Sequence, residues 1–220
     1  LHLLYARFIT KFLSDEKLID FDEPFAKLRN QGLILGPDGN KMSKSRGNVI
    51  NPDEIVENYG ADTLRLYEMF LGPLEQVKPW DINGIEGAFR FLKRVYRLFG
   101  DGNMGDGGMH ARTQTLINVV SSKIESYHFN TAISSMMEYV NWCVSDKGKL
   151  TSKDAQKFIK LLSPFAPHIA EELWMMNGGE GLVSNSPWPK IIEDGASIYV
   201  TLPIQVNGRV RATIEIDSKA

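Results

Sequence analysis

Cysteine is nearly absent from this chain of 220 residues, in which Cys143 is the single example. One cysteine cannot form an internal disulfide, and the sequence has neither a Cys-X-X-Cys pair nor a Cys/His cluster with zinc spacing. We therefore expect no metal to be bound by this chain. Such sparse use of cysteine is typical of a reducing compartment, and we expect a cytoplasmic protein.

Long apolar runs and an excess of one charge are also lacking. No stretch approaches the roughly 20 apolar residues that a membrane-spanning helix needs, and the first residues do not follow a signal-peptide pattern. We therefore expect a soluble protein without a membrane partner. The 25 basic and 27 acidic residues nearly cancel, so contact with a polyanion requires a local basic patch.

Hydrophobic residues make up 43% of the chain, which is enough for one ordinary core or two small ones. Helical spacing of apolar residues predicts a helix over 1–13 and a short second helix over 25–30. No capping residue precedes the first helix, so we expect the chain to begin inside a longer protein. Residues 33–35 are predicted to form a brief buried strand. The turn-forming segment 36–40 then places residues 41–48 in a loop.

Capping signals mark the helices that follow this loop. Asn51-Pro52 starts one helix, and a second is predicted over 61–71. A connector over 73–84 leads to a helix over 86–99 with one apolar and one basic side. The basic side, called here the basic face, consists of Arg90, Lys93, Arg94 and Arg97, and the apolar side of Phe89, Leu92, Val95, Tyr96 and Phe99.

Further helices are predicted at about 112–127, from an Asn130 cap onward, from Thr151 to just before Pro164, and over 167–174. Each has one apolar stripe and the connections are short, as an antiparallel bundle requires. Near the end the period changes from 3.6 to 2. Asn207-Gly208 separates alternating segments at 198–206 and 209–216, a strong hairpin signal. We expect this hairpin to be the start of another, truncated domain.

The loop at 41–48, called here the lysine loop, has the chemistry of a phosphate site. Lys41 and Lys44 supply two ammonium groups three residues apart, and serine hydroxyls and backbone N–H groups add donors. Such charges would stabilise a departing pyrophosphate. The alternative is that the loop is merely solvated, as most Lys/Ser-rich loops are.

The amino-acid sequence of the lysine loop and its surroundings resembles a known signature. Lys41-Met42-Ser43-Lys44-Ser45, continued by 46–52 and 59–65, is similar to the second signature loop of class I aminoacyl-tRNA synthetases. Five further stretches resemble the leucine-specific members of that family more than the isoleucine, valine or methionine members. They occur in the family's order, at 2–8, 30–35, 86–96, 163–174 and 205–211.

The resemblance implies that the parent protein activates leucine with ATP, accompanied by Mg, and transfers it to tRNA(Leu). Lys44 would be the main catalytic lysine and Lys41 its assistant, with ATP bound by Lys41, Met42, Ser43, Lys44 and Ser45. The family's His-rich ATP motif and its zinc and editing insertions are absent from this chain, and so is an insertion that many relatives carry before the lysine loop. We therefore expect the chain to be inactive alone.

The implied fold is mainly α: an anticodon-binding-type helical bundle, preceded by the α/β tail of a Rossmann-like catalytic domain and followed by a truncated β-hairpin. The implied domains are the catalytic tail at 1–50, a helical connector at 51–80, the tRNA-docking bundle at 81–177, and a linker with the hairpin at 178–220.

The basic face is the candidate for binding tRNA phosphates, with Arg209 and Arg211 as weaker candidates on the hairpin. A solvated outer face is the alternative. His168, next to Pro167, is expected to pack or cap rather than to catalyse. Two other functions stay open: a stand-alone RNA-binding helical module without catalysis, and a structural bundle that contacts only protein.

Overall fold

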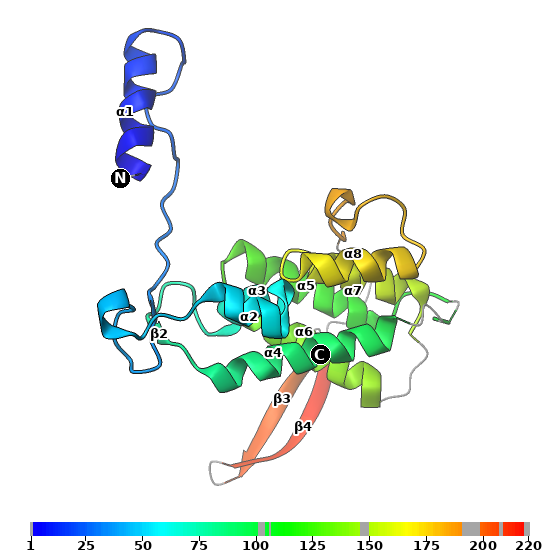
Figure 1. Cartoon of the computed structure of the whole chain (residues 1–220). Coiled ribbons are helices and arrows are strands. Elements are labelled where there is room, and N and C mark those ends of the chain that lie inside the picture. The colour runs from blue at the N-terminus through cyan, green and yellow to red at the C-terminus, as the bar shows by residue number, and fades with distance from the viewer. Residues whose placement is uncertain are drawn as a thin grey trace. The chain divides into compact units, whose positions relative to one another are not determined.

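The computed structural model describes residues 2–100, 104–105, 107–145, 150–190, 199–206 and 209–217, the last two ranges as backbone only. The chain divides into two units, Leu1–Gln31 and Gly32–Ala220. The described residues are mainly helical (Figure 1). In that part of the chain, no helix is long and apolar enough to cross a membrane.

The first unit contains α1, His2–Asp15, which confirms the predicted helix. Glu23 forms ion pairs back to this helix, at 2.7 Å from Arg7 Nη2 and 3.4 Å from Lys11 Nζ. The hydrogen bond from Arg7 lowers the pKa of Glu23 to about 2. The second helix predicted over 25–30 is wrong, because these residues are irregular and exposed. So short a segment lacks the packing that would offset the cost of helix nucleation.

The second unit opens with a two-stranded parallel sheet. Strand β1, Ile34–Leu35, pairs with β2, Lys78–Pro79, so that Ile34 lies opposite Lys78. The chain just before β1 approaches the segment before β2 so closely that a Cβ on Gly32 would collide with the carbonyl of Gln76. The sequence predicted a strand here but not its partner, which lies more than 40 residues further on.

Between these strands lie the 3-10 helix η1, Lys44–Arg46, and helices α2, Pro52–Tyr59, and α3, Ala61–Phe70. Asn51 caps α2 as predicted, since its side chain accepts a hydrogen bond from Asp53 N at 3.1 Å. Helix α3 ends one residue before the predicted boundary.

The remaining helices form the predicted bundle: α4, Ile82–Phe99; α5, Ala111–Glu125; α6, Phe129–Ser145; α7, Ser152–Leu162; and α8, Pro167–Met176. Helix α4 begins four residues earlier than predicted, because Asp81 caps it through Asn83 N at 2.9 Å. The cap predicted at Asn130 is wrong, since α6 already begins at Phe129. Thr151 and Asp154 form the full capping box of α7.

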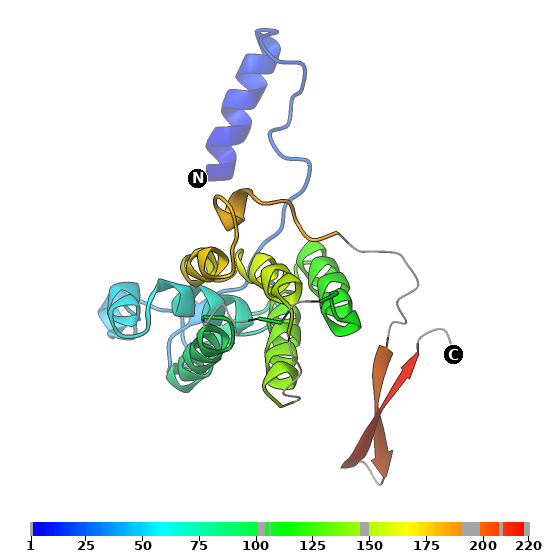
Figure 2. The same cartoon turned by 90° about the vertical axis from the view of Figure 1, so that its right-hand side faces the viewer.

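One continuous core joins helices α3 to α8, which Figure 2 shows from a second direction. The ring of Phe158 stacks on those of Phe99 and Tyr139, with centroid distances of 4.9 and 5.6 Å. Tyr67 of α3 meets Trp80 edge to face at 5.0 Å in the same core. A boundary between connector and bundle near residue 80 therefore stays a prediction, because buried side chains are continuous across it.

The hairpin signal near the end is confirmed. Strand β3, Tyr199–Val206, pairs antiparallel with β4, Arg209–Asp217, and Val206 lies opposite Arg209. The pairing is irregular between Ile204 and Gln205. The predicted turn at 207–208 lies outside the described residues. A short 3-10 helix, Val183–Asn185, follows α8 in the chain.

Candidate functional site

The lysine loop is entered through a tight turn, as the sequence predicted. Gly36 N donates to Asn40 O at 2.8 Å, and Leu35 and Lys41 form an isolated antiparallel bridge. The loop itself is irregular except for the single turn of η1. Gly47 ends that turn with a φ of 66°, a left-handed conformation that glycine adopts without steric cost.

Asp38 and Asn48 brace the two ends of this loop. Asn48 Oδ1 accepts from Ser43 N at 2.8 Å, and Asn48 Nδ2 donates to the Asp38 carboxylate at 3.0 and 3.2 Å. Asp38 also accepts from Asn40 N at 3.1 Å. The hydrogen bond from Asn48, followed by that from Asn40, lowers the pKa of Asp38. The sequence analysis missed this brace, although Asp and Asn in turns commonly accept backbone N–H groups.

Lys41 and Lys44 are both exposed, and no carboxylate among the described residues forms an ion pair with either ammonium group. Ser43 Oγ and Ser45 Oγ lie 2.8 Å apart. Met42 is half-buried and packs against the core. Met42 thus anchors the lysine loop to the core, while the ammonium groups of Lys41 and Lys44 remain available to an anion.

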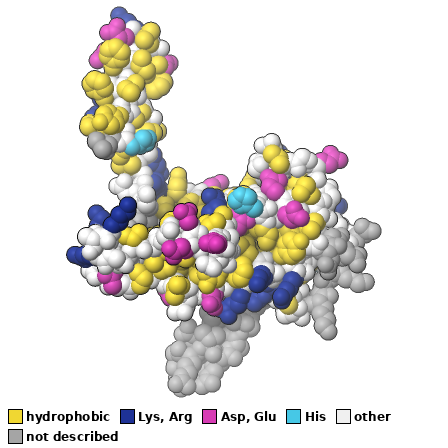
Figure 3. Space-filling model, in the orientation of Figure 1, with side chains coloured by type: hydrophobic (Ala, Val, Ile, Leu, Met, Phe, Trp, Pro, Cys, Tyr) yellow, Lys and Arg dark blue, Asp and Glu magenta, His cyan; other side chains and the backbone are white. Residues whose placement is uncertain are grey.

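The basic face of α4 is exposed at all four positions. Figure 3 shows Lys and Arg side chains gathered along this helix. In the part of the chain that is described, none of the four forms an ion pair with an acidic side chain. Arg94 donates to Asn141 Oδ1 of α6, and Lys93 Nζ lies 4.2 Å from the centre of the Phe89 ring. The face therefore offers nearly unneutralised positive charge.

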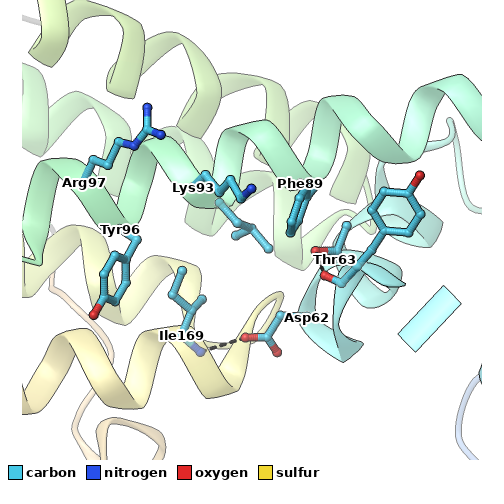
Figure 4. A pocket seen from close by; sticks show the side chains of 9 residues that line it. Asp62, Thr63, Phe89, Lys93, Tyr96, Arg97 and Ile169 are labelled. Atoms are coloured by element: carbon cyan, nitrogen blue, oxygen red, sulfur yellow. Dashed lines mark hydrogen bonds between the residues drawn. The ribbon is translucent and has the colours of Figure 1, made fainter. Parts of the chain in front are cut away.

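The apolar side of α4 differs from the prediction at its edge. Leu92, Val95 and Phe99 are buried as expected, but Tyr96 is 43% exposed and Phe89 is half-buried. A cavity of about 390 Å³ opens beside them, which is the physical reason for the difference. It is lined by residues from α2, α3, α4 and α8: Tyr59, Asp62, Thr63, Phe89, Leu92, Lys93, Tyr96, Arg97 and Ile169 (Figure 4).

Asp62, one of these lining residues, caps helix α8. Its carboxylate accepts from His168 N at 3.3 Å and Ile169 N at 2.7 Å, and His168 Nδ1 lies 2.8 Å away. A carboxylate at a helix N-terminus satisfies free N–H groups and is favoured by the helix dipole. His168, whose side chain is 77% exposed, thus belongs to a capping arrangement, as expected.

A second aspartate, Asp154, is the centre of a buried polar cluster. Its oxygens lie 2.6 Å from Thr113 Oγ1, 2.7 Å from Thr151 Oγ1 and 2.6 Å from His110 Nδ1. Thr113 in turn contacts Tyr139 Oη at 2.7 Å. Burial raises the pKa of Asp154, but the hydrogen bonds from Thr113, Thr151 and His110 outweigh it and lower that pKa. The sequence indicated only the cap at Thr151.

Arg209 and Arg211 lie in β4, of which the backbone is described. A search of the described residues finds no group of three or more His, Cys, Asp or Glu side chains that could hold a metal ion.

Two segments of the chain, one containing the lysine loop and one containing α5 to α8, match known families. Residues 8–78 match the class I tRNA synthetases (I, L, M and V), and residues 106–220 match the anticodon-binding domain of tRNA ligase. The chain therefore belongs to the anticodon-binding domain family of tRNA ligases and carries a class I synthetase segment before it. This confirms the mainly α fold class predicted from the sequence.

Within that class, the chain is similar to leucine–tRNA ligases. Those of Rubrobacter xylanophilus and Bdellovibrio bacteriovorus are 45% and 49% identical over 98% of this chain, which spans 28% of their length. A solved structure, the ternary complex of Agrobacterium radiobacter K84 agnB2 LeuRS with tRNA and LeuAMS, has a TM-score of 0.79 and 36% identity. The similarity covers 99% of this chain and 30% of that one. The resemblance to leucine-specific synthetases is thereby confirmed.

Proposed function

We propose that this chain is part of a leucine–tRNA ligase, a cytoplasmic enzyme that activates leucine with ATP and transfers it to tRNA(Leu). The observation that carries the proposal is the lysine loop. Its two ammonium groups are exposed and form no ion pair with a described carboxylate, while Asp38 and Asn48 close the loop beneath them. The similarity to leucine–tRNA ligases supports the same function.

In the first step, a carboxylate oxygen of leucine attacks the α-phosphorus of ATP. A new phosphorus–oxygen bond forms, the bond to the bridging oxygen breaks, and its electron pair leaves with pyrophosphate. Lys44 stabilises the negative charge that develops on this leaving group, and Lys41 assists. Met42, Ser43 and Ser45 complete the ATP-binding segment, and Mg accompanies the phosphates as part of the substrate complex. A hydroxyl of the terminal ribose of tRNA(Leu) then attacks the carbonyl carbon of the leucyl-adenylate, an ester bond forms, and AMP leaves with the electron pair of the broken carbon–oxygen bond.

The bundle docks the tRNA in this scheme. Arg90, Lys93, Arg94 and Arg97 contact successive phosphates, and Arg209 and Arg211 add contacts from the hairpin. Each phosphate contact displaces condensed counterions, so affinity for tRNA falls as salt concentration rises. Each of these roles belongs to one of the proposed domains, which are the catalytic tail at 1–50, the connector at 51–80, the docking bundle at 81–177 and the hairpin segment at 178–220.

Lys44→Gln separates catalysis from RNA binding in a protein that contains this chain together with the remaining length of its relatives. Leucine-dependent ATP–pyrophosphate exchange is expected to fall by a factor on the order of 100 or more, as when a preorganised charge is removed from a transition state. The dissociation constant for tRNA(Leu) is expected to stay within about twofold, because one exposed lysine contributes little to so large a polyanion interface.

Lys153→Gln is the matched control, since Lys153 is an exposed lysine in the first turn of α7, outside the lysine loop. Exchange in this variant should equal that of the unmodified protein. If Lys44→Gln also leaves exchange unchanged, the lysine loop has no catalytic part, and the RNA-binding module without catalysis becomes the better description.

A further inference from the structure

The cavity beside α4 is not explained by the lysine loop or by the packing of the bundle. We propose that it is a binding site for a single unpaired nucleotide of the bound tRNA, whose base stacks on Tyr96 while its phosphates meet Lys93 and Arg97. This inference rests on the proposed tRNA-docking function and adds to it a pocket that would hold one base outside its helical stack.

Tyr96 provides the stacking surface. The residue is 43% exposed although it belongs to a helix whose neighbouring residues Leu92 and Val95 are buried. No ring or cation among the described residues packs on it. Gly100, one turn further along, carries no side chain beside this residue, and a Cβ there would collide with Tyr96 O at 2.5 Å. An exposed aromatic face of this kind is what single-stranded nucleic-acid sites use to bind bases.

The rest of the cavity suits the flat apolar face of a base. Phe89, Leu92 and Ile169 form much of its lining, and its volume of about 390 Å³ falls within the roughly 300–1,000 Å³ of ligand pockets. Two polar lining residues of α3, Asp62 and Thr63, are already engaged. Thr63 Oγ1 donates to Tyr59 O at 2.7 Å, and the Asp62 carboxylate caps α8. With few free groups to read base edges, the site should bind by stacking and discriminate weakly between bases.

The charges at the cavity favour a nucleotide over an apolar peptide. Lys93 and Arg97 lie one helical turn apart on the same side of α4 and both line the cavity (Figure 4). Arg90 and Arg94 continue the same positive surface along the helix. The negative charge of Asp62 is offset by the N–H groups and dipole of α8. A phosphate beside a stacked base therefore meets complementary charge.

Fluorescence of a single-stranded RNA that contains 2-aminopurine tests the stacking directly, because this base is quenched when it stacks on an aromatic ring. The chain is titrated with this probe and, separately, with a tRNA(Leu) transcript. Tyr96→Leu should abolish the quenching and weaken binding of the probe at least about fivefold, the smallest effect expected for one stacked base. Tyr96→Phe keeps the ring and should retain both.

Two controls distinguish the cavity from the rest of the surface. Tyr5→Leu removes another exposed tyrosine, one that does not line the cavity, and should behave like the unmodified chain. Arg97→Gln and Arg90→Gln remove similar exposed charges, but only Arg97 lines the cavity. Both variants should weaken tRNA binding. Arg90→Gln measures what the loss of one charge alone does to binding of the probe, and Arg97→Gln should weaken binding of the probe by more than that. Far-UV circular dichroism verifies that each variant is folded.

The outcomes separate this inference from the proposed function. If tRNA binding is salt-dependent and is weakened by Arg90→Gln, but Tyr96→Leu and Tyr96→Phe both bind the probe and tRNA like the unmodified chain, the nucleotide pocket is overturned while tRNA docking stands. If the unmodified chain binds neither RNA, both ideas fall, and a protein segment is the better occupant of the cavity.

Discussion

Asp38 and Asp154 each collect several hydrogen-bond donors, but one does so in solvent at the entrance to the lysine loop and the other inside the bundle. The donors to Asp38 come from Asn40 and Asn48, within ten residues of it. The donors to Asp154 include His110, 44 residues away, and Thr113, 41 residues away. The first aspartate therefore organises a local turn, whereas the second holds helices together.

The two sets of hydrogen bonds differ in their surroundings. Those around Asp38 are exposed, and because water competes for such bonds they shape the lysine loop with little gain in stability. Asp154 is fully buried, and its cluster links α5, α6 and α7. A buried charge without its partners is costly, so this cluster can exist only when the helices are packed. The same side chain thus organises an exposed loop in one place and holds packed helices together in the other.

The largest expected effect is that of Asp154→Ala. Removing this carboxylate leaves several buried donors unsatisfied, and the free energy of unfolding should fall by about 3–5 kcal/mol. Urea denaturation followed by circular dichroism measures the loss. Asp38→Ala removes the same group in solvent and should leave the urea midpoint close to that of the unmodified chain. Equal losses in the two variants would contradict the distinction between a local and a structural aspartate.

Lowering the pH should also distinguish Asp154 from Asp38, with a smaller effect on the free energy of unfolding than Asp154→Ala has. The pKa of Asp154 is lower in the folded than in the unfolded chain, so its stabilising contribution is present above the ordinary carboxyl pKa of about 4. As pH falls below this value, the unfolded chain binds the proton first and the contribution is lost. Urea unfolding at pH values between about 5 and 2.5 should therefore give a shallower pH dependence for Asp154→Asn than for the unmodified chain.

Asp38→Asn is the comparison for this experiment. The pKa of Asp38 is also lowered, by hydrogen bonds from Asn48 and Asn40, but its carboxylate lies in solvent. The pH dependence of the free energy of unfolding of Asp38→Asn should therefore stay near that of the unmodified chain. A change as large as that of Asp154→Asn would show that the loop brace stabilises the whole fold.

Asn48→Ala is also expected to have only a small effect on stability. Loss of the bond to Ser43 N and of the bond to Asp38 should lower the free energy of unfolding by about 1 kcal/mol or less. The amide of Ser43 should nevertheless exchange its hydrogen distinctly faster, which NMR measures. Asn58→Ala, which removes an exposed asparagine bonded to Glu54 O within α2, is the control. Unchanged exchange at Ser43 would mean that Asn48 does not brace the loop.

Local signals predicted most of the helices and the hairpin. Asn51, Thr151 and Pro167 begin helices where the sequence indicated, because capping depends on residues only two or three positions apart. Where a local signal had to compete with packing, prediction failed. The segment 25–30 stays exposed, with the Phe25 ring 6.1 Å from that of His2, and Tyr96 was assigned to a buried stripe although a cavity opens beside it.

The sequence by itself determined the helical periods, the local caps at Asn51 and Thr151, and the residues of the lysine loop and the basic face, since each depends on neighbours along the chain. Only the tertiary structure decided which distant groups meet. It paired β1 with β2, directed Asp62 to the start of α8 across 106 residues, and gathered the donors around Asp154. Such partners depend on how helices pack, and packing is a property of the whole core that no local pattern encodes.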